Sequence, residues 1–197
     1  GIPGGKNPFL LTTQSAKLEH NARSGVADVL NTLQAVQYLA PSNVSGTCNT
    51  CGSETKGCRG ACLHGSGRMG MFPQVGWATN VRTDFAAEHP DLYLGVWHGN
   101  VIAHRNKALK KGLIPVVRHG GTSDIQLDQL QSSEILIGEH PDVMFNEYTK
   151  HGTTRVEDVR MSSPFSNYYF VHSAHERMPL AVAQHITSHG GNLAVPY

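Results

Sequence analysis

All four cysteines of the chain lie within one short segment, and this clustering constrains the protein more than any other feature. Cys48, Cys51, Cys58 and Cys62 have the spacing C-x2-C-x6-C-x3-C, and glycines are scattered through the surrounding segment 46–70. Four thiols this close in sequence either pair as disulfides or converge on a metal or cluster. In a reducing cytoplasm, clustered cysteines are more often metal ligands or redox groups than structural disulfides.

The cysteine spacing favours an iron–sulfur cluster over zinc. Structural zinc sites usually join two short CxxC pairs across about a dozen or more residues, whereas the two cysteine pairs here are close together. A [4Fe–4S] cluster is wider than a single ion and accepts ligands from one compact loop, and glycines let backbone N–H groups approach its sulfides. We therefore expect a [4Fe–4S] cluster on the four cysteines. Structural zinc is the main alternative, and His64 is the one histidine near enough in sequence to act as a substitute ligand.

Length and charge narrow the class of protein. A chain of 197 residues is long enough for one domain with a substantial core. Its 16 basic and 15 acidic residues give a net charge of +1, so nucleic-acid binding is not indicated. The sequence has no apolar run of membrane-spanning length and no signal-peptide pattern. We therefore expect no membrane association and a cytoplasmic location.

Strand and helix patterns alternate over most of the chain. Helices are predicted at 91–111 and 179–189, where apolar residues recur at helical spacing between proline and glycine boundaries. The five predicted strands are 35–42, 113–120, 143–149, 167–173 and 192–197. Strands joined by helix-length connections are typical of right-handed βαβ units in a parallel sheet.

The predicted fold class is α/β, either a partial (β/α) barrel or an open parallel sheet, with the cysteine-rich cluster loop after the first strand. Five strands are too few for a closed eight-stranded barrel. The partial barrel is favoured because the polar residues that end each strand would then converge on one face. The start of the chain is harder to assign: 9–18 has strand-like composition, and 25–36 has apolar residues at near-helical spacing. We predict an N-terminal extension that packs on the core at 1–34 and an iron–sulfur-binding βα-repeat domain at 35–197.

Polar residues follow the predicted strands, and in parallel α/β folds the C-terminal edge of the sheet is where sites are built. The residues at these strand ends are 118–124, 146–150, His172, Ser173, His175, Glu176 and Arg177. Among them, Arg118, Asp124, Glu147 and Lys150 are predicted to hold the polar groups of a bound cofactor or substrate. A structural alternative is that Asp124 caps a helix beginning with IQLDQL.

Several segments of the chain resemble the gene product 88 family of actinobacterial phages. They are YLAPSNVSG, NTC, KGCRGACL, GSGR, PVVRHGGTSDI, FNEYTK and GGNLAV, and they extend from Tyr38 to Val195. The family has no firmly assigned activity, so the resemblance implies a phage protein that works in a bacterial host cytoplasm and supplies no reaction. The noncatalytic role considered below would give it a host or phage protein as its partner. The resemblance also implies that the cluster ligands are Cys51, Cys58 and Cys62, while Cys48 stands at a position that need not be cysteine.

Three thiolates on a [4Fe–4S] cluster would leave one iron with an open position. Radical S-adenosylmethionine enzymes use such an iron, and they place a Gly-Gly-acid segment after the second strand of a partial barrel. Gly120, Gly121 and Asp124 are similar to that segment, although those enzymes use C-x3-C-x2-C, which this chain lacks. Two functions are therefore expected: a noncatalytic iron–sulfur protein with a redox-sensitive or partner-binding role, which we favour, and an enzyme that binds S-adenosylmethionine.

Overall fold

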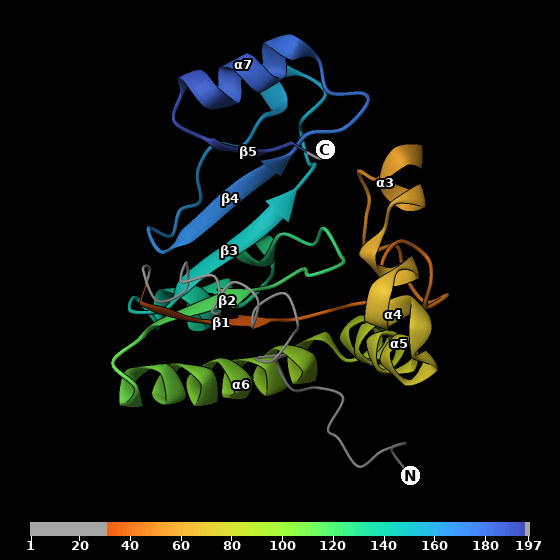
Figure 1. The fold of residues 1–197 in the computed structure, drawn as a ribbon. Helices are drawn as coiled ribbons and strands as arrows, with labels where there is room; N and C mark the ends of the chain where they lie inside the picture. The colour runs from red at the N-terminus through yellow and green to blue at the C-terminus, as the bar shows by residue number, and fades with distance from the viewer. Residues whose placement is uncertain (1–30, 196–197) are drawn as a thin grey trace.

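A computed structural model describes residues 31–195 of the protein (Figure 1). The predicted extension at 1–34 lies almost entirely outside the described residues, and so does the strand-like stretch 9–18. The helices and strands, labelled as in Figure 1, are β1 (Thr32–Val36), α3 (Lys56–Gly60), α4 (Gly67–Met71), α5 (Pro73–Glu88), α6 (Pro90–Lys110), β2 (Ile114–Arg118), β3 (Met144–Thr149), β4 (Tyr168–Ser173), α7 (Leu180–Ser188) and β5 (Asn192–Ala194). Shorter helical turns occur at Leu63–Gly65, Leu127–Gln129, Glu134–Gly138 and Val156–Asp158.

The described strands form an open parallel sheet in the order β1-β2-β3-β4-β5, with β1 and β5 at its edges. This result confirms the predicted α/β class with an open parallel sheet. Because the spatial order follows the chain order, the sheet lacks the reversal of a doubly wound fold and winds as a (β/α) barrel does. The cysteine segment follows β1, as predicted.

The first strand begins and ends earlier than predicted. The sequence predicted this strand at 35–42, but β1 covers Thr32–Val36. The helical character suggested by the apolar spacing over 25–36 is therefore wrong for the residues from Thr32 onward. Each residue of β1 pairs with one residue of β2, from Thr32 with Ile114 to Val36 with Arg118. This parallel pairing satisfies the backbone groups of β1, and such tertiary pairing overrides a weak local pattern.

The two predicted helices are present with nearly the predicted bounds. Helix α6 has Pro90 in its first turn together with Asp91, and Lys107 and Lys110 in its last turn, an arrangement that suits the helix dipole. Gly112 follows with a φ of +68°, a left-handed conformation that glycine adopts without strain. Helix α5 was not predicted, and it ends where Pro90 starts the next helix.

The core lies between α6 and one face of the sheet. Trp97 and Val101 of α6 are buried against Val117 of β2 and Phe145 of β3, and the rings of Trp97 and Phe145 are 6.1 Å apart. On the other face of β3, Asn146 and Tyr148, which alternate with the core positions, are partly exposed. At β3, one face of the sheet is therefore packed against the core and the other face is partly exposed.

Helices α3, α4 and α5 lie beside the end of the sheet toward which β3 and β4 point (Figure 1). The chain enters this region after β1 and leaves it through α6, which runs back along β1 and β2. The cysteine segment is thereby placed at the C-terminal edge of the parallel strands, where the polar strand ends also lie.

Candidate functional site

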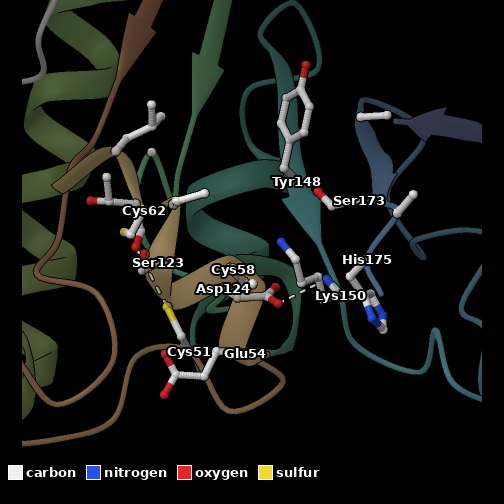
Figure 2. Close-up of a pocket in the computed structure, with 18 of the residues that line it drawn as sticks. Cys51, Glu54, Cys58, Cys62, Ser123, Asp124, Tyr148, Lys150, Ser173 and His175 are labelled. Carbon is white, nitrogen blue, oxygen red and sulfur yellow. Dashed lines mark hydrogen bonds between the residues drawn. The ribbon is translucent and has the colours of Figure 1, made fainter. Parts of the chain in front are cut away.

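A pocket of about 760 Å³ lies at the C-terminal edge of the sheet (Figure 2). Its walls come from the cysteine segment and from the ends of β2, β3, β4 and β5. The lining residues used below are Cys51, Cys58, Cys62, Arg118, Gly120, Gly121, Asp124, Tyr148, Lys150 and Glu176. The expected convergence of the polar strand ends on one site is therefore observed for β2, β3 and β4, while β5 contributes the apolar residues Ala194 and Val195.

Three of the four cysteines line this pocket, and Cys48 does not. Cys58 lies in α3, and Cys62 follows four residues later, directly before the helical turn Leu63–Gly65. Cys51 lies earlier, in the turn before α3, and its Sγ is 3.6 Å from the carbonyl oxygen of Thr122 in the loop after β2. Two separate parts of the segment thus bring thiols to the same cavity.

The surroundings of two of the thiols, Cys48 and Cys51, favour the protonated form. Burial raises the pKa of Cys51, a rise that hydrogen bonds from Ser42 and Thr50 partly oppose. Burial and the carboxylate of Asp84 raise the pKa of Cys48. All four cysteines are free. Since a metal or cluster takes the thiolate form, binding at Cys51 would release a proton.

The thiols line a common cavity without forming a close group. Within residues 31–195, the His, Cys, Asp and Glu side chains form no group of three or more that could hold a single metal ion. His64 does not line the pocket; its Nε2 is 3.3 Å from the hydroxyl of Thr79 in α5. His64 is thus not placed as a substitute ligand.

Glu176, in the loop after β4, anchors the start of α3. Its carboxylate accepts hydrogen bonds from the hydroxyl of Thr55 at 2.8 Å and from the N–H of Gly57 at 2.9 Å. The Gly57 N–H, with further backbone and hydroxyl donors, lowers the pKa of Glu176 to about 2. Thr55 also caps α3 by accepting a hydrogen bond from the N–H of Cys58. The cysteine helix is therefore tied directly to the end of β4.

Asp124 ties the cysteine segment to the loops after β2 and β3. Its backbone N–H donates to the carbonyl of Thr50 at 2.8 Å, and its Oδ2 accepts a hydrogen bond from the backbone N–H of Lys150 at 2.9 Å. The predicted cap on a helix beginning with IQLDQL is wrong, because this stretch forms only the short turn Leu127–Gln129. The carboxylate of Asp124 instead joins two strand-end loops.

Arg118 lies at the end of β2, with its guanidinium carbon 4.2 Å from the centre of the Tyr148 ring. Its Nη2 is 3.4 and 3.5 Å from the carbonyl oxygens of Gly120 and Gly121, and its Nε is buried without a partner among the described residues. Burial lowers the pKa of Arg118. Arg118, Asp124 and Lys150, three of the predicted site residues, are therefore brought together at the pocket.

Glu147, the fourth predicted site residue, does not line the pocket. It is 0% exposed, and its Oε2 accepts hydrogen bonds from the hydroxyl of Tyr168 and from the N–H of Leu127. Burial raises the pKa of Glu147 to about 8. His172, another residue of the predicted polar edge, is likewise buried rather than at the pocket.

Tyr148 and Glu176 take roles that the sequence prediction did not give them. Both were among the polar strand-end residues, but Tyr148 was not predicted as a platform for Arg118, nor Glu176 as the anchor of α3. A period-two pattern signals the first role: Phe145 and Glu147 share one face of β3, so Tyr148 belongs to the opposite face. No local pattern signals the second, because Glu176 and Gly57 are far apart in sequence.

The pocket combines thiols, cations and carboxylates, so it can hold a metal cluster and polar parts of a small molecule.

None of the helices within residues 31–195 has the length and apolar character needed to cross a membrane. Comparison with curated proteins and with solved structures gave no match. A family model described as Gene product 88 matches residues 9–197, almost the whole chain. The chain belongs to the gene product 88 family.

Proposed function

We propose that the protein is an iron–sulfur protein in which Cys51, Cys58 and Cys62 hold a [4Fe–4S] cluster in the pocket. The observation that carries this proposal is the placement of three thiols on one cavity at the C-terminal edge of a parallel sheet. Cys48 lies outside that cavity, so it is not included among the ligands. The cluster would supply electron transfer or an iron atom that binds a further ligand.

The donor set fits a cluster better than a single zinc ion. Zinc needs its ligands close around one point, at about 2.3 Å from each sulfur. The described cysteines form no such group, but Cys51, Cys58 and Cys62 line a cavity that is large enough for a wider object. Contacts of Glu176 with Gly57 and of Asp124 with Thr50 fix the cysteine segment at two points, one on each side of Cys51, which favours a preformed cluster site.

The role we propose for the cluster is redox-sensitive or partner-binding, in the cytoplasm of a bacterial host. Large apolar side chains next to the cysteine segment support a protein partner. Leu63 directly follows Cys62, and Met71 and Phe72 lie in and after α4, which packs on the turn that contains Leu63. All three side chains are exposed, and neighbouring exposed apolar residues often mark interaction sites.

Anaerobic purification tests the proposal directly. The protein should be brown, should contain about four iron and four sulfide ions per chain, and should show a visible absorption band that dithionite bleaches. A colourless protein with one equivalent of zinc would overturn the cluster and support the structural zinc alternative instead.

Serine variants of the cysteines sort the ligands. Cys51→Ser, Cys58→Ser and Cys62→Ser should lose most of the cluster, because a hydroxyl replaces a thiolate ligand. Cys48→Ser is the matched control, since it makes the same change in the same segment but outside the pocket, and it should keep the full iron content. Loss of the cluster in Cys48→Ser alone would contradict the three-cysteine assignment.

A second candidate function is an enzyme that binds S-adenosylmethionine at the open iron. Two placements support it: Cys48 is outside the pocket, and Gly120, Gly121 and Asp124 line the pocket beside the three cysteines. S-adenosylmethionine should then change the electron paramagnetic resonance spectrum of the reduced cluster. An unchanged spectrum at saturating S-adenosylmethionine would leave the noncatalytic role as the surviving proposal.

A further inference from the structure

The pocket wall formed by the ends of β2 and β3 carries two cations, Arg118 and Lys150. Arg118 is the last residue of β2, and Tyr148 of β3 lies under its guanidinium, 4.2 Å from ring centre to guanidinium carbon. A stacked guanidinium has a fixed plane and a fixed direction for its N–H groups. This wall therefore presents the oriented Arg118 cation to the pocket, and the cysteines belong to a different wall.

Arg118 has no carboxylate partner within residues 31–195. The ion pairs of the described residues involve other cations. Among these residues, the acceptors near Arg118 are the two glycine carbonyls at 3.4 and 3.5 Å, which are long for hydrogen bonds. The Lys150 ammonium also lacks an ion pair with a described carboxylate. A half-buried charge is normally paired with an opposite charge, so the unpaired Arg118 is suited to bind an anion that comes from outside the protein.

The carboxylates around the pocket are engaged elsewhere. Glu176 binds the N–H of Gly57 and the hydroxyl of Thr55, and Glu54 accepts from Arg59 and from Ser42. Asp124 accepts the backbone N–H of Lys150 through Oδ2, and its Oδ1 lies 3.8 Å from Nε2 of His151. Glu147, on the core face of β3, is largely uncharged at neutral pH because burial raises its pKa to about 8. None of these groups neutralises Arg118 by direct contact.

We propose that Arg118, supported by Tyr148 and Lys150, binds the carboxylate of a small organic acid in the pocket. The planar guanidinium matches the two oxygens of a carboxylate or phosphate. A carboxylate is favoured because Glu54, Asp124 and Glu176 line the same pocket and would repel the second charge of a phosphate. This anion site goes beyond the proposed cluster, since it uses none of the cysteines.

Isothermal titration calorimetry of the full chain at constant ionic strength tests the proposal with propionate, its neutral analogue propionamide and inorganic phosphate. Propionate should bind at one site per chain with a dissociation constant in the millimolar range, and propionamide should give no saturable heat. Binding of propionamide as tightly as propionate would refute a charge-dependent site. Tighter binding of phosphate than of propionate would overturn the carboxylate assignment.

Matched variants locate the binding. Arg118→Gln should abolish propionate binding, because the positive charge is lost. Arg118→Lys keeps the charge but loses the paired N–H groups of the guanidinium, so it should weaken binding about ten-fold. Tyr148→Phe should bind normally, whereas Tyr148→Ala should bind more weakly because the stacking platform is lost. Lys111→Gln, an exposed lysine at the end of α6, is the charge control and should bind as the wild type does.

Equal affinity of wild type, Arg118→Lys and Tyr148→Ala would refute the site even if Arg118→Gln failed to fold. The outcome is also separate from that of the cluster proposal. A colourless protein that binds propionate through Arg118 would remove the cluster and keep the anion site, and a brown protein without propionate binding would do the reverse.

Discussion

The carboxylate of Glu176 and the backbone N–H of Gly57 are joined by a 2.9 Å hydrogen bond that links the end of β4 to the cysteine helix α3. A larger residue at Gly57 would require the carboxylate to move, because a Cβ there would lie 2.9 Å from Oε2 of Glu176. Gly60, in the same short helix, has open space where a Cβ would stand, with no neighbouring side chain within 4 Å. Alanine substitutions at Gly57 and Gly60 therefore form a matched test and control within one helix.

Gly57→Ala should displace the Glu176 carboxylate and release the start of α3, while Gly60→Ala should leave the anchor intact. Hydrogen–deuterium exchange over residues 55–58 measures this directly, and it should become faster in Gly57→Ala only. If the proposed cluster is present, its iron content should fall in Gly57→Ala and stay unchanged in Gly60→Ala. Equal exchange in both variants would show that Glu176 is not the anchor.

Glu147 should make the stability of the protein depend on pH. Burial raises its folded-state pKa to about 8 from an ordinary value of 4.5. The protonated form is favoured in the folded protein, so its stability contribution is complete below about pH 4.5 and is lost as the pH rises toward 8. Glu147→Gln, which stays neutral, should be more stable than the wild type by about 2–4 kcal/mol at pH 8.

At pH 4.5 the same Glu147→Gln variant should differ little from the wild type, because both side chains are then neutral. Urea unfolding at the two pH values measures the difference. Glu88→Gln, at an exposed position at the end of α5, controls for the loss of one negative charge. A pH-independent difference between Glu147→Gln and wild type would mean that Glu147 is charged in the folded protein.

The buried ion pair of Arg160 and Asp128 should matter more than the exposed pair of Arg155 and Glu157. Two nitrogens of Arg160 bind the two oxygens of Asp128 at 2.9 and 2.6 Å, and the Asp128 side chain is 0% exposed. Arg160→Met leaves a buried carboxylate unpaired and should lower the free energy of unfolding by about 3 kcal/mol.

Arg155→Met makes the same chemical change at a pair whose side chains are 69% and 64% exposed. It should change the free energy of unfolding by less than about 0.5 kcal/mol, because exposed ion pairs contribute little. Chemical denaturation of both variants gives the comparison. Similar losses in the two variants would contradict the buried role assigned to Asp128.

Gly121, in the loop after β2, is required by packing. A Cβ there would lie 2.5 Å from the Tyr38 ring and 2.7 Å from a methyl group of Val36. Gly121→Ala should therefore destabilise the protein by about 1–3 kcal/mol through overpacking. Gly99→Ala, in α6 with open space around it, should instead stabilise by about 0.5–1 kcal/mol through helix propensity. Thermal unfolding should show shifts of opposite sign, and a shift of the same sign would refute the packing argument.

The regular elements with a clear local pattern were predictable. Strands β2 to β5 and helices α6 and α7 were found near their predicted bounds, because apolar periodicity and proline or glycine boundaries mark them. Helix α5 was missed because its buried residues are polar: Thr79, Arg82 and Thr83. Thr83 accepts a hydrogen bond from the N–H of Ala40, and Phe85 and Ala86 near the end of the helix pack against the core, so its buried face is mixed and gives no clear apolar stripe.

The sequence by itself determined the alternation of β2 to β5 with helices α6 and α7, the parallel sheet and the gathering of polar strand ends at one edge. These features follow from local periodicity and from the fact that parallel strands end on the same side. The tertiary structure decided which side chains face the pocket. Successive residues of β3 point to opposite faces, so packing of one face against the core directs Glu147 inward and leaves Tyr148 beside Arg118. The same dependence on folding separates Cys48 from the three cysteines at the pocket.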